Sequence, residues 1–396
     1  MTVTVRTPRA AATTRAIVLL GLSLAALTVL CAALRIPMAD AQVYRAEGAA
    51  VAHGGPLYGF TVTPWHLPAT YPPFAALLFL PTAFVPLSAL KAAFCGANVA
   101  LLALLVVLSC RFARIEVRAA HVLAATALAL WLEPVFQTLI FGQVNLALVC
   151  LVLWDLSRPA GAFAKGFAVG LAAGIKITPL FFVLHLLVRG RVREALTALA
   201  GFITTVLVAA LVLPYASVEF FTRRLFETGR VGKAWIVDNQ SLQGLLARLL
   251  HTPAPGMVWA AGALVVGAAG LWIARRAEER HALLVSSFTA LLISPISWSH
   301  HWVWCVPLIA LAAGEGRARA AVVLAVVFTA RTLWLVPHAG ELDLQLPLWQ
   351  QPLASPYALV GLAVLGWATR RSGRRAAPVE PDAQLPARSS SASMIR

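Results

Sequence analysis

The feature that most constrains this chain is a series of long, uninterrupted apolar runs, such as AIVLLGLSLAALTVLCAAL at residues 16–34. A helix of roughly 20 residues crosses the ~30 Å hydrocarbon core of a bilayer. Several runs approach that length, and 60% of the residues are hydrophobic while 12% are charged. The runs do not alternate polar and apolar residues as transmembrane β-strands do, which leaves helices as the spanning elements. The sequence therefore predicts an all-α, polytopic integral membrane protein.

The formal net charge of +16 indicates topology rather than a nucleic-acid partner. The arginines cluster in short segments between the apolar runs and near the C-terminal end, which is the pattern of the positive-inside rule. The five cysteines lie within or beside apolar runs and show no CxxC spacing. Neither a disulfide framework nor a zinc site is therefore expected.

The basic clusters predict how the chain crosses the membrane. Residues 1–15 are expected in the cytoplasm, with the first apolar run as an uncleaved span and residues 37–87 as the first external loop. A basic cluster at residues 111–118 must be cytoplasmic, so the region from residue 72 to residue 110 can cross only once. The proline-containing stretch PPFAALLFLPTAFVP is then expected along the outer interface, because proline interrupts a spanning helix.

A second interruption is predicted at GIKITP, residues 174–179. Basic residues flank both ends of the apolar run around it, so two short helices meeting at residues 176–179 fit the charge rule better than one crossing. The complete prediction has about twelve membrane segments in a domain of residues 16–370, an external loop at 214–256, and both termini in the cytoplasm. The Pro-, Ser- and Ala-rich tail at 371–396 is expected to be disordered.

This topology places three polar segments on the outer face. They are the first loop with Asp40, the segment 222–241, and ISPISWSHHWVW at residues 293–304. Any polar residue could end the helix at the mouth of this span. The sequence instead places two adjacent histidines there, which are titratable, beside tryptophans. Convergence of these segments predicts a functional site.

The residue types indicate group transfer to a hydroxyl from a phosphate-activated donor. A carboxylate can accept a proton, histidines and cations can neutralise a phosphate, and tryptophan and tyrosine can stack on sugar rings. Nucleotide sugars are confined to the cytosol, so an external transferase needs a lipid-linked donor such as a polyprenyl phosphate sugar. The chain has no Rossmann glycine fingerprint and no P-loop, and GLAAGIK is interpreted as small residues for helix packing.

Successive blocks of the sequence resemble glycosyltransferase family 87. The blocks include DAQVYRAEGAAVAHGGPLYG, FGQVNLALVCLVLWDL, GLAAGIKITPLFFVLHLLVRGR, DNQSLQGLLARL and SPISWSHHWVW, in order over residues 40–304. The resemblance implies a GT-C fold and an inverting α-mannosyl transfer from polyprenyl-phosphate mannose. It also implies a glycolipid or glycan acceptor at the outer face of the cell membrane.

The resemblance also implies which residues carry the reaction. Asp40 matches the acidic residue of the first external loop and is the predicted general base. The family's later histidine matches His300 or His301, and the residues do not decide between them. The other predicted substrate contacts are cations for the phosphate, aromatic rings for the sugar and amides for its hydroxyl groups: Arg45, Lys176, Tyr44, Tyr71, Trp298, Asn239 and Gln240.

Alternatives remain open at this point. Lys176 could be a snorkelling side chain, and packing explains the aromatic residues as well as stacking does. If Asp40 is not the base, Glu47, Glu219 or Asp238 would be the next candidates. No acidic pair at metal-binding spacing joins Asp40, so neither a metal nor a cofactor is expected.

Two other functions compete with mannosyl transfer. An arabinofuranosyltransferase of the same fold, using polyprenyl-phosphate arabinose, is not distinguished by any residue. A lipid or sugar transporter is less favoured, because no inverted repeat and no set of polar residues near mid-membrane is evident.

Overall fold

The computed structural model describes residues 8–375, and its regular secondary structure is almost entirely helical. The α-helices are α1 (Pro8–Ala33), α2 (Ala39–His53), α3 (Pro73–Phe79), α4 (Leu87–Phe112), α5 (Ala119–Ala129), α6 (Glu133–Phe141), α7 (Asn145–Ser157), α8 (Phe167–Ile175), α9 (Phe181–Val188), α10 (Val192–Val212), α11 (Pro214–Thr222), α12 (Leu242–Leu249), α13 (Gly256–Arg276), α14 (Glu279–Ile293), α15 (Cys305–Gly314), α16 (Ala318–Thr329), α17 (Gln351–Ala354) and α18 (Pro356–Arg375).

Short elements complete the chain. The 3₁₀ helices are η1 (Leu80–Phe84), η2 (Thr178–Leu180), η3 (Arg224–Phe226), η4 (Thr228–Arg230), η5 (Ser299–Trp304), η6 (Thr332–Trp334), η7 (Leu342–Gln345) and η8 (Leu348–Gln350). The strands β1 (Thr61–Val62) and β2 (Leu67–Pro68) form one antiparallel hairpin, with Thr61 opposite Pro68.

The helices confirm an all-α membrane protein. Four of those described are long and apolar enough to cross a bilayer: Ala11–Ala33, Leu87–Phe112, Val192–Val212 and Gly256–Arg276. Two bent helix pairs raise the number to as many as six, and three apolar helices are shorter. The twelve segments and the cytoplasmic location of both termini stay predictions.

One expected crossing, at residues 121–140, is a bent pair. Helices α5 and α6 meet at 76°. Pro134 lies in the first turn of α6, where its missing N–H costs nothing but where it cannot continue a preceding helix. The buried Glu133 beside it accepts hydrogen bonds from Trp334 Nε1 and Tyr357 Oη, both at 2.9 Å, which ties the bend to the C-terminal part of the chain.

The predicted interruption at residues 174–179 is confirmed. Helix α8 ends at Ile175, Lys176 has extended backbone, and α9 begins at Phe181 after η2. At the other ends of this helix pair, Lys165 Nζ and Arg191 Nη1 lie 3.9 and 3.6 Å from the Glu194 carboxylate. The pair therefore runs inward to Lys176 and returns to the same end of the molecule.

Close packing of α8 on α10 holds Lys176 in place. Gly166, Gly170 and Gly174 recur every fourth residue, and a Cβ atom at Gly170 would lie 2.1 Å from the Ala198 carbonyl oxygen. Backbones approach this closely only where side chains are absent. The interpretation of GLAAGIK as packing residues is confirmed.

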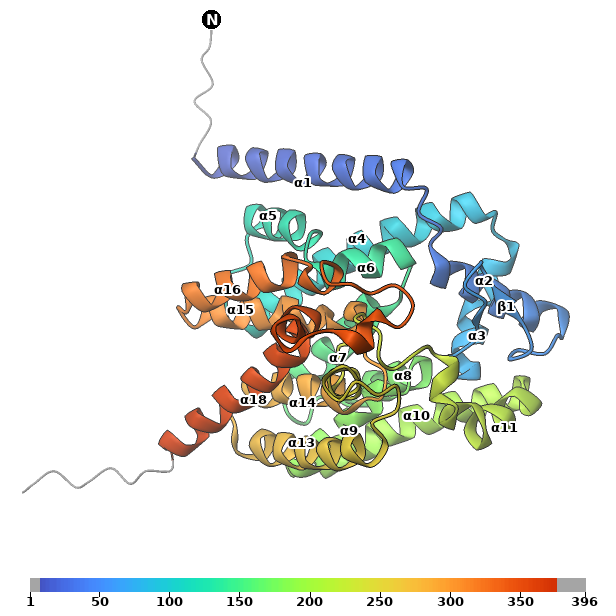
Figure 1. Cartoon of the computed structure of the whole chain (residues 1–396). Helices are drawn as coiled ribbons and strands as arrows, with labels where there is room; N and C mark the ends of the chain where they lie inside the picture. Colours follow the sequence, from blue (N-terminus) through green and yellow to red (C-terminus); the bar gives the residue numbers. More distant parts are fainter. Residues whose placement is uncertain (1–7, 376–396) are drawn as a thin grey trace, which may run out of the picture.

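The first and second predicted loops are structured and lie together. Figure 1 shows α2, β1, α3 and α11 gathered at the right-hand end of the bundle. There Arg230 Nη2 donates to the Tyr58 carbonyl oxygen at 3.3 Å, and the Tyr58 ring stacks on Phe220.

The ends of the chain differ slightly from the predicted boundaries. Helix α1 begins at Pro8, inside the segment 1–15 that was assigned to the N-terminal region, and α18 continues to Arg375. The first five residues of the predicted disordered tail are therefore helical. Residues 376–396 lie outside the described part of the chain.

Candidate active site

A cavity of about 660 Å³ lies among four parts of the chain: α2, η5, the break at Lys176, and the segment that follows α11. It is lined by six of the ten predicted site residues: Asp40, Tyr71, Lys176, Trp298, His300 and His301. The three polar segments that the topology placed on one face therefore meet at one cavity.

Asp40 lies in the first turn of α2. Burial raises the pKa of its carboxyl group to about 6, although hydrogen bonding from Gln143 and the charge of Lys176 act in the opposite direction. The neighbouring carboxylate of Asp238 raises it further. Asp40 is thus mostly ionised at neutral pH, with a basicity higher than that of an ordinary aspartate.

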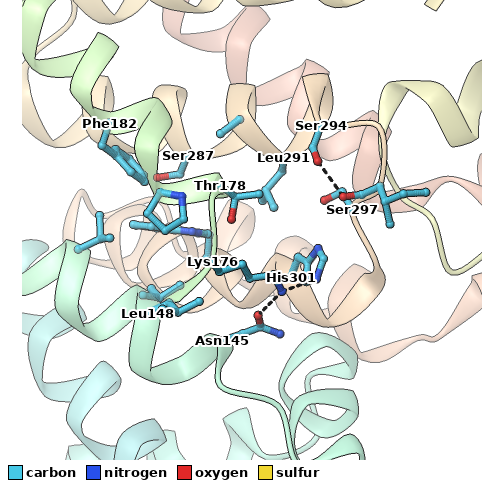
Figure 2. A pocket seen from close by; sticks show the side chains of 16 residues that line it. Asn145, Leu148, Lys176, Thr178, Phe182, Ser287, Leu291, Ser294, Ser297 and His301 are labelled. Atoms are coloured by element: carbon cyan, nitrogen blue, oxygen red, sulfur yellow. Dashed lines mark hydrogen bonds between the residues drawn. The ribbon is translucent and has the colours of Figure 1, made fainter. Parts of the chain in front are cut away.

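Lys176 and His301 form a polar pair at the wall of the cavity. Lys176 Nζ lies 2.8 Å from His301 Nε2 and donates to Asn145 Oδ1 at 3.1 Å, as Figure 2 shows. Since an ammonium group has only donors, Nε2 of His301 is the acceptor and Nδ1 carries the proton. The described residues place no carboxylate within 4.0 Å of Lys176, so its charge has no ion-pair partner in this part of the chain.

A second, smaller pocket of about 60 Å³ adjoins the cavity at this pair. Figure 2 shows apolar side chains such as Leu148, Phe182 and Leu291 around it. Lys176 and His301 line both spaces. A charged group bound at this pair would therefore lie where the two spaces meet.

His300 is held through its backbone, and its ring is buried without a hydrogen-bond partner among the described residues. The carbonyl oxygen of His300 accepts hydrogen bonds from Thr138 Oγ1 at 3.2 Å and Asn145 Nδ2 at 3.0 Å. The ring packs against Phe141 and His301, and His300 as a whole residue is 4% exposed. Within the described residues, neither ring nitrogen has a hydrogen-bond partner. Burial and the nearby Lys176 charge hold the pKa of both histidines well below its usual value, so both rings are neutral at pH 7.

The other four predicted residues do not line the cavity. Arg45 Nε donates to the Val85 carbonyl oxygen at 3.2 Å. Tyr44 is buried behind Tyr71, 2.9 Å from it between the hydroxyl oxygens. Asn239 and Gln240 are fully buried and have their own protein partners.

Asn239 and Gln240 instead anchor the loop that carries Trp298. The Asn239 Oδ1 atom accepts a hydrogen bond from the backbone N–H of Ser297 at 2.9 Å. The backbone N–H of Gln240 donates to the Ser297 carbonyl oxygen at 2.8 Å. Gln240 Nε2 also donates to the Ala354 carbonyl oxygen at 2.8 Å. Their position in the structure is that of supports behind the cavity wall.

The sequence did not single out Gln143 and Asn145 as site residues, although both are at the site. They lie in FGQVN, within one of the blocks that carry the family resemblance, where two amides flank a short break in an apolar run. The contrast between these two polar amides and the apolar residues around them was the signal that could have identified them as site residues. Asp238, considered only as a substitute base, also lines the cavity, and its Oδ1 accepts from the Ser299 amide at 3.1 Å.

Comparison with known proteins gives a consistent result. The model of glycosyltransferase family 87 matches residues 69–295. The chain is 33% identical over 359 residues to a polyprenol-phosphate-mannose-dependent alpha-(1-2)-phosphatidylinositol mannoside mannosyltransferase of Mycobacterium tuberculosis, covering 82% of this chain and 83% of the relative. It is 35% identical over 346 residues to a polyprenol-phosphate-mannose-dependent alpha-(1-2)-phosphatidylinositol pentamannoside mannosyltransferase of the same species, covering 83% and 80%.

A relative in Mycolicibacterium smegmatis, with the phosphatidylinositol mannoside mannosyltransferase name, is 31% identical over 365 residues and covers 82% of each chain. No solved structure matches the chain significantly. The family match spans more than half of the sequence, and the relatives span most of it. The chain therefore belongs to glycosyltransferase family 87 and is a membrane glycosyltransferase.

Proposed function

We propose that the protein transfers a mannosyl residue from polyprenyl-phosphate mannose to a hydroxyl of a phosphatidylinositol mannoside, on the extracytoplasmic face of the plasma membrane. The donor and acceptor are those named for the mycobacterial relatives. The observation that carries the proposal is that Asp40 and the Lys176–His301 pair line the same cavity. Membership of a glycosyltransferase family favours transfer over transport.

Asp40 acts as the general base. Its carboxylate accepts the proton of the acceptor hydroxyl while that oxygen forms a bond to the anomeric carbon of the donor. The bond from this carbon to the phosphate oxygen breaks, and its electron pair leaves with the polyprenyl phosphate. One displacement inverts the anomeric centre and needs a single base, unlike glycoside hydrolysis, where a second carboxyl group serves as acid.

The Lys176–His301 pair stabilises the departing phosphate. A cation without an ion-pair partner, held at the cavity wall by two hydrogen bonds, is well placed to compensate the charge that develops on the leaving oxygen. His300, whose ring packs against that of His301, lines the same cavity wall beside this pair. Tyr71 and Trp298 present aromatic walls to the sugar ring.

The direct test is transfer by the purified protein. Labelled polyprenyl-phosphate mannose and, separately, polyprenyl-phosphate arabinose are supplied with a mycobacterial phosphatidylinositol mannoside extract. Labelled product from the mannose donor, and none from the arabinose donor, is expected. Product from arabinose alone would establish the arabinofuranosyltransferase instead, and product from neither donor would overturn the proposal.

A further inference from the structure

The turn between α6 and α7 is pressed against the helix that carries Asp40. Gly142 has a left-handed backbone with φ of 71°, and a Cβ atom there would lie 2.8 Å from Ala41 Cβ. The amides of Gly142 and Gln143 donate to the carbonyl oxygens of Leu139 and Thr138 at 3.1 and 2.9 Å, which closes the end of α6. The next side chain, that of Gln143, is thereby set beside Asp40 in the cavity wall.

Two tyrosine hydroxyls hold the Gln143 side chain by its oxygen. The Oη atoms of Tyr44 and Tyr71 both lie 2.9 Å from Gln143 Oε1. Both tyrosines are buried, and each hydroxyl donates its hydrogen to this protein partner. With Oε1 on the tyrosine side, Nε2 is the end of the amide that is left to donate to Asp40. The reversed amide would set its carbonyl oxygen against the carboxylate.

Hydrogen bonding from Gln143 has a direct effect on the ionisation of Asp40. A donor to the carboxylate favours the charged form and lowers the pKa, partly offsetting the effect of burial. The ionisable groups that face Asp40 from the surrounding elements are Lys176, Asp238, Glu47, Tyr44, Tyr71, His300 and His301. Of these, Lys176 is the one that acts in the same direction as Gln143.

We propose that Gln143 is a positioning residue, which holds one oxygen of the Asp40 carboxylate and leaves the other free toward the acceptor hydroxyl. This inference rests on the proposed role of Asp40 as the base. A carboxylate has two oxygens, and a general base must place one of them within hydrogen-bond reach of the proton that it removes. Tyr44 and Tyr71 act through Gln143, because their hydroxyls decide which end of the amide faces Asp40.

The test compares Gln143→Met and Gln143→Glu with the unchanged protein. Loss of a hydrogen bond to a charged group should lower the transfer rate about 10- to 100-fold, with donor binding retained. The acid limb of the pH–rate profile should move to higher pH, because Asp40 loses a donor that favours its ionised form. The displacement should be larger for Gln143→Glu, which adds a negative charge where Gln143→Met adds none.

A second variant and a control keep the test decisive if Gln143→Met folds poorly. The double variant Tyr44→Phe and Tyr71→Phe keeps the amide but frees it to turn, so it should move the acid limb in the same direction. Tyr58→Phe is the matched control. Its buried hydroxyl donates to the Tyr71 carbonyl oxygen at 2.9 Å and not to Gln143, so the pH profile should stay unchanged.

Asp40→Asn, measured in parallel, separates this inference from the proposed function. If Asp40→Asn is inactive while the Gln143 variants keep the normal pH profile, Gln143 has at most a structural role and the inference is wrong. If Asp40→Asn transfers normally, the assignment of the base is wrong. A displaced acid limb in the Gln143 variants, together with an inactive Asp40→Asn, supports both.

Discussion

The carboxyl group of Asp40 should determine the acid side of the pH dependence. Because its pKa is raised to about 6, chiefly by burial, the group is ionised and able to accept a proton above that pH and protonated below it. The value of kcat/KM should therefore fall as the pH drops through about 6. Initial rates measured on both sides of this value check the midpoint, and a midpoint near the ordinary aspartate value of about 4 would contradict the environment described here.

Replacement of the same residue tests its role. Asp40→Asn keeps the shape of the side chain and removes its basicity, so transfer should fall about 100- to 10,000-fold. Donor binding should persist, which distinguishes loss of the base from loss of the fold. Near-normal turnover would direct attention to Asp238, since this carboxylate shares the cavity.

Lys176 provides the second residue-scale prediction. Lys176→Met removes the cation but keeps the length of the side chain, so both donor affinity and turnover should fall, by at least about tenfold each, as expected for a lost charge-assisted contact to phosphate. Lys233→Met, at an exposed position outside the cavity, is the matched control and should be close to normal. Equal activity of the two variants would show that Lys176 does not contact the donor phosphate.

At this scale the sequence predicted residue types better than contacts. Asp40 and the two histidines could be found because charge and imidazole stand out at the end of an apolar run. Gln143 could not, because its importance depends on two tyrosine hydroxyls that reach it from the first loop. Asn239 and Gln240 look equally polar in sequence, yet their hydrogen bonds are used within the protein.

At the scale of the element, α8 shows how helix packing supports a site. Gly170→Ala would place a methyl group 2.1 Å from the Ala198 carbonyl oxygen, so α8 must move away from α10 and displace Lys176 at its end. We expect lower thermal stability and lower transfer activity together. Gly96→Ala, in α4, has no heavy atom within 4 Å of the added carbon and should be neutral or stabilising by up to about 1 kcal/mol.

Thermal inactivation of both variants in detergent, followed by a transfer assay, makes the comparison. Equal stability of Gly170→Ala and Gly96→Ala would mean that the α8–α10 contact can relax without cost.

The two helix breaks differ in how well the sequence predicted them. Basic residues on both flanks require an even number of crossings, which predicted the break at Lys176. The bend between α5 and α6 has no such charge signal, and it depends on Pro134 and on the partners of Glu133 near the C-terminal end of the chain.

Across the whole molecule, basic clusters that are distant in sequence meet at one end. Arg191 Nη2 pairs with Glu279 at 2.8 Å, and Arg189 Nη1 donates to the Ala277 carbonyl oxygen at 2.7 Å. The cavity lies at the opposite ends of α7 and α14, which have 13 and 15 residues and therefore run for roughly 20 Å. The predicted convergence of charge at one end and of site residues at the other is thus present in the fold.

The sidedness of the membrane protein can be tested with single cysteines in a background that lacks the five native ones. Gly55→Cys and Gly229→Cys lie at exposed positions in the two loops beside the cavity, whereas Ala160→Cys lies at the basic end, after α7. Gly232 would be a poor choice, because a side chain there would meet the Trp298 ring at 2.7 Å.

If the cavity is extracytoplasmic, an impermeant thiol reagent should label positions 55 and 229 in intact cells and position 160 only after the membrane is permeabilised. The positive-inside rule and the need for a lipid-linked donor both require this result. Labelling of position 160 alone in intact cells would place the cavity in the cytoplasm, where a nucleotide sugar could serve as the donor.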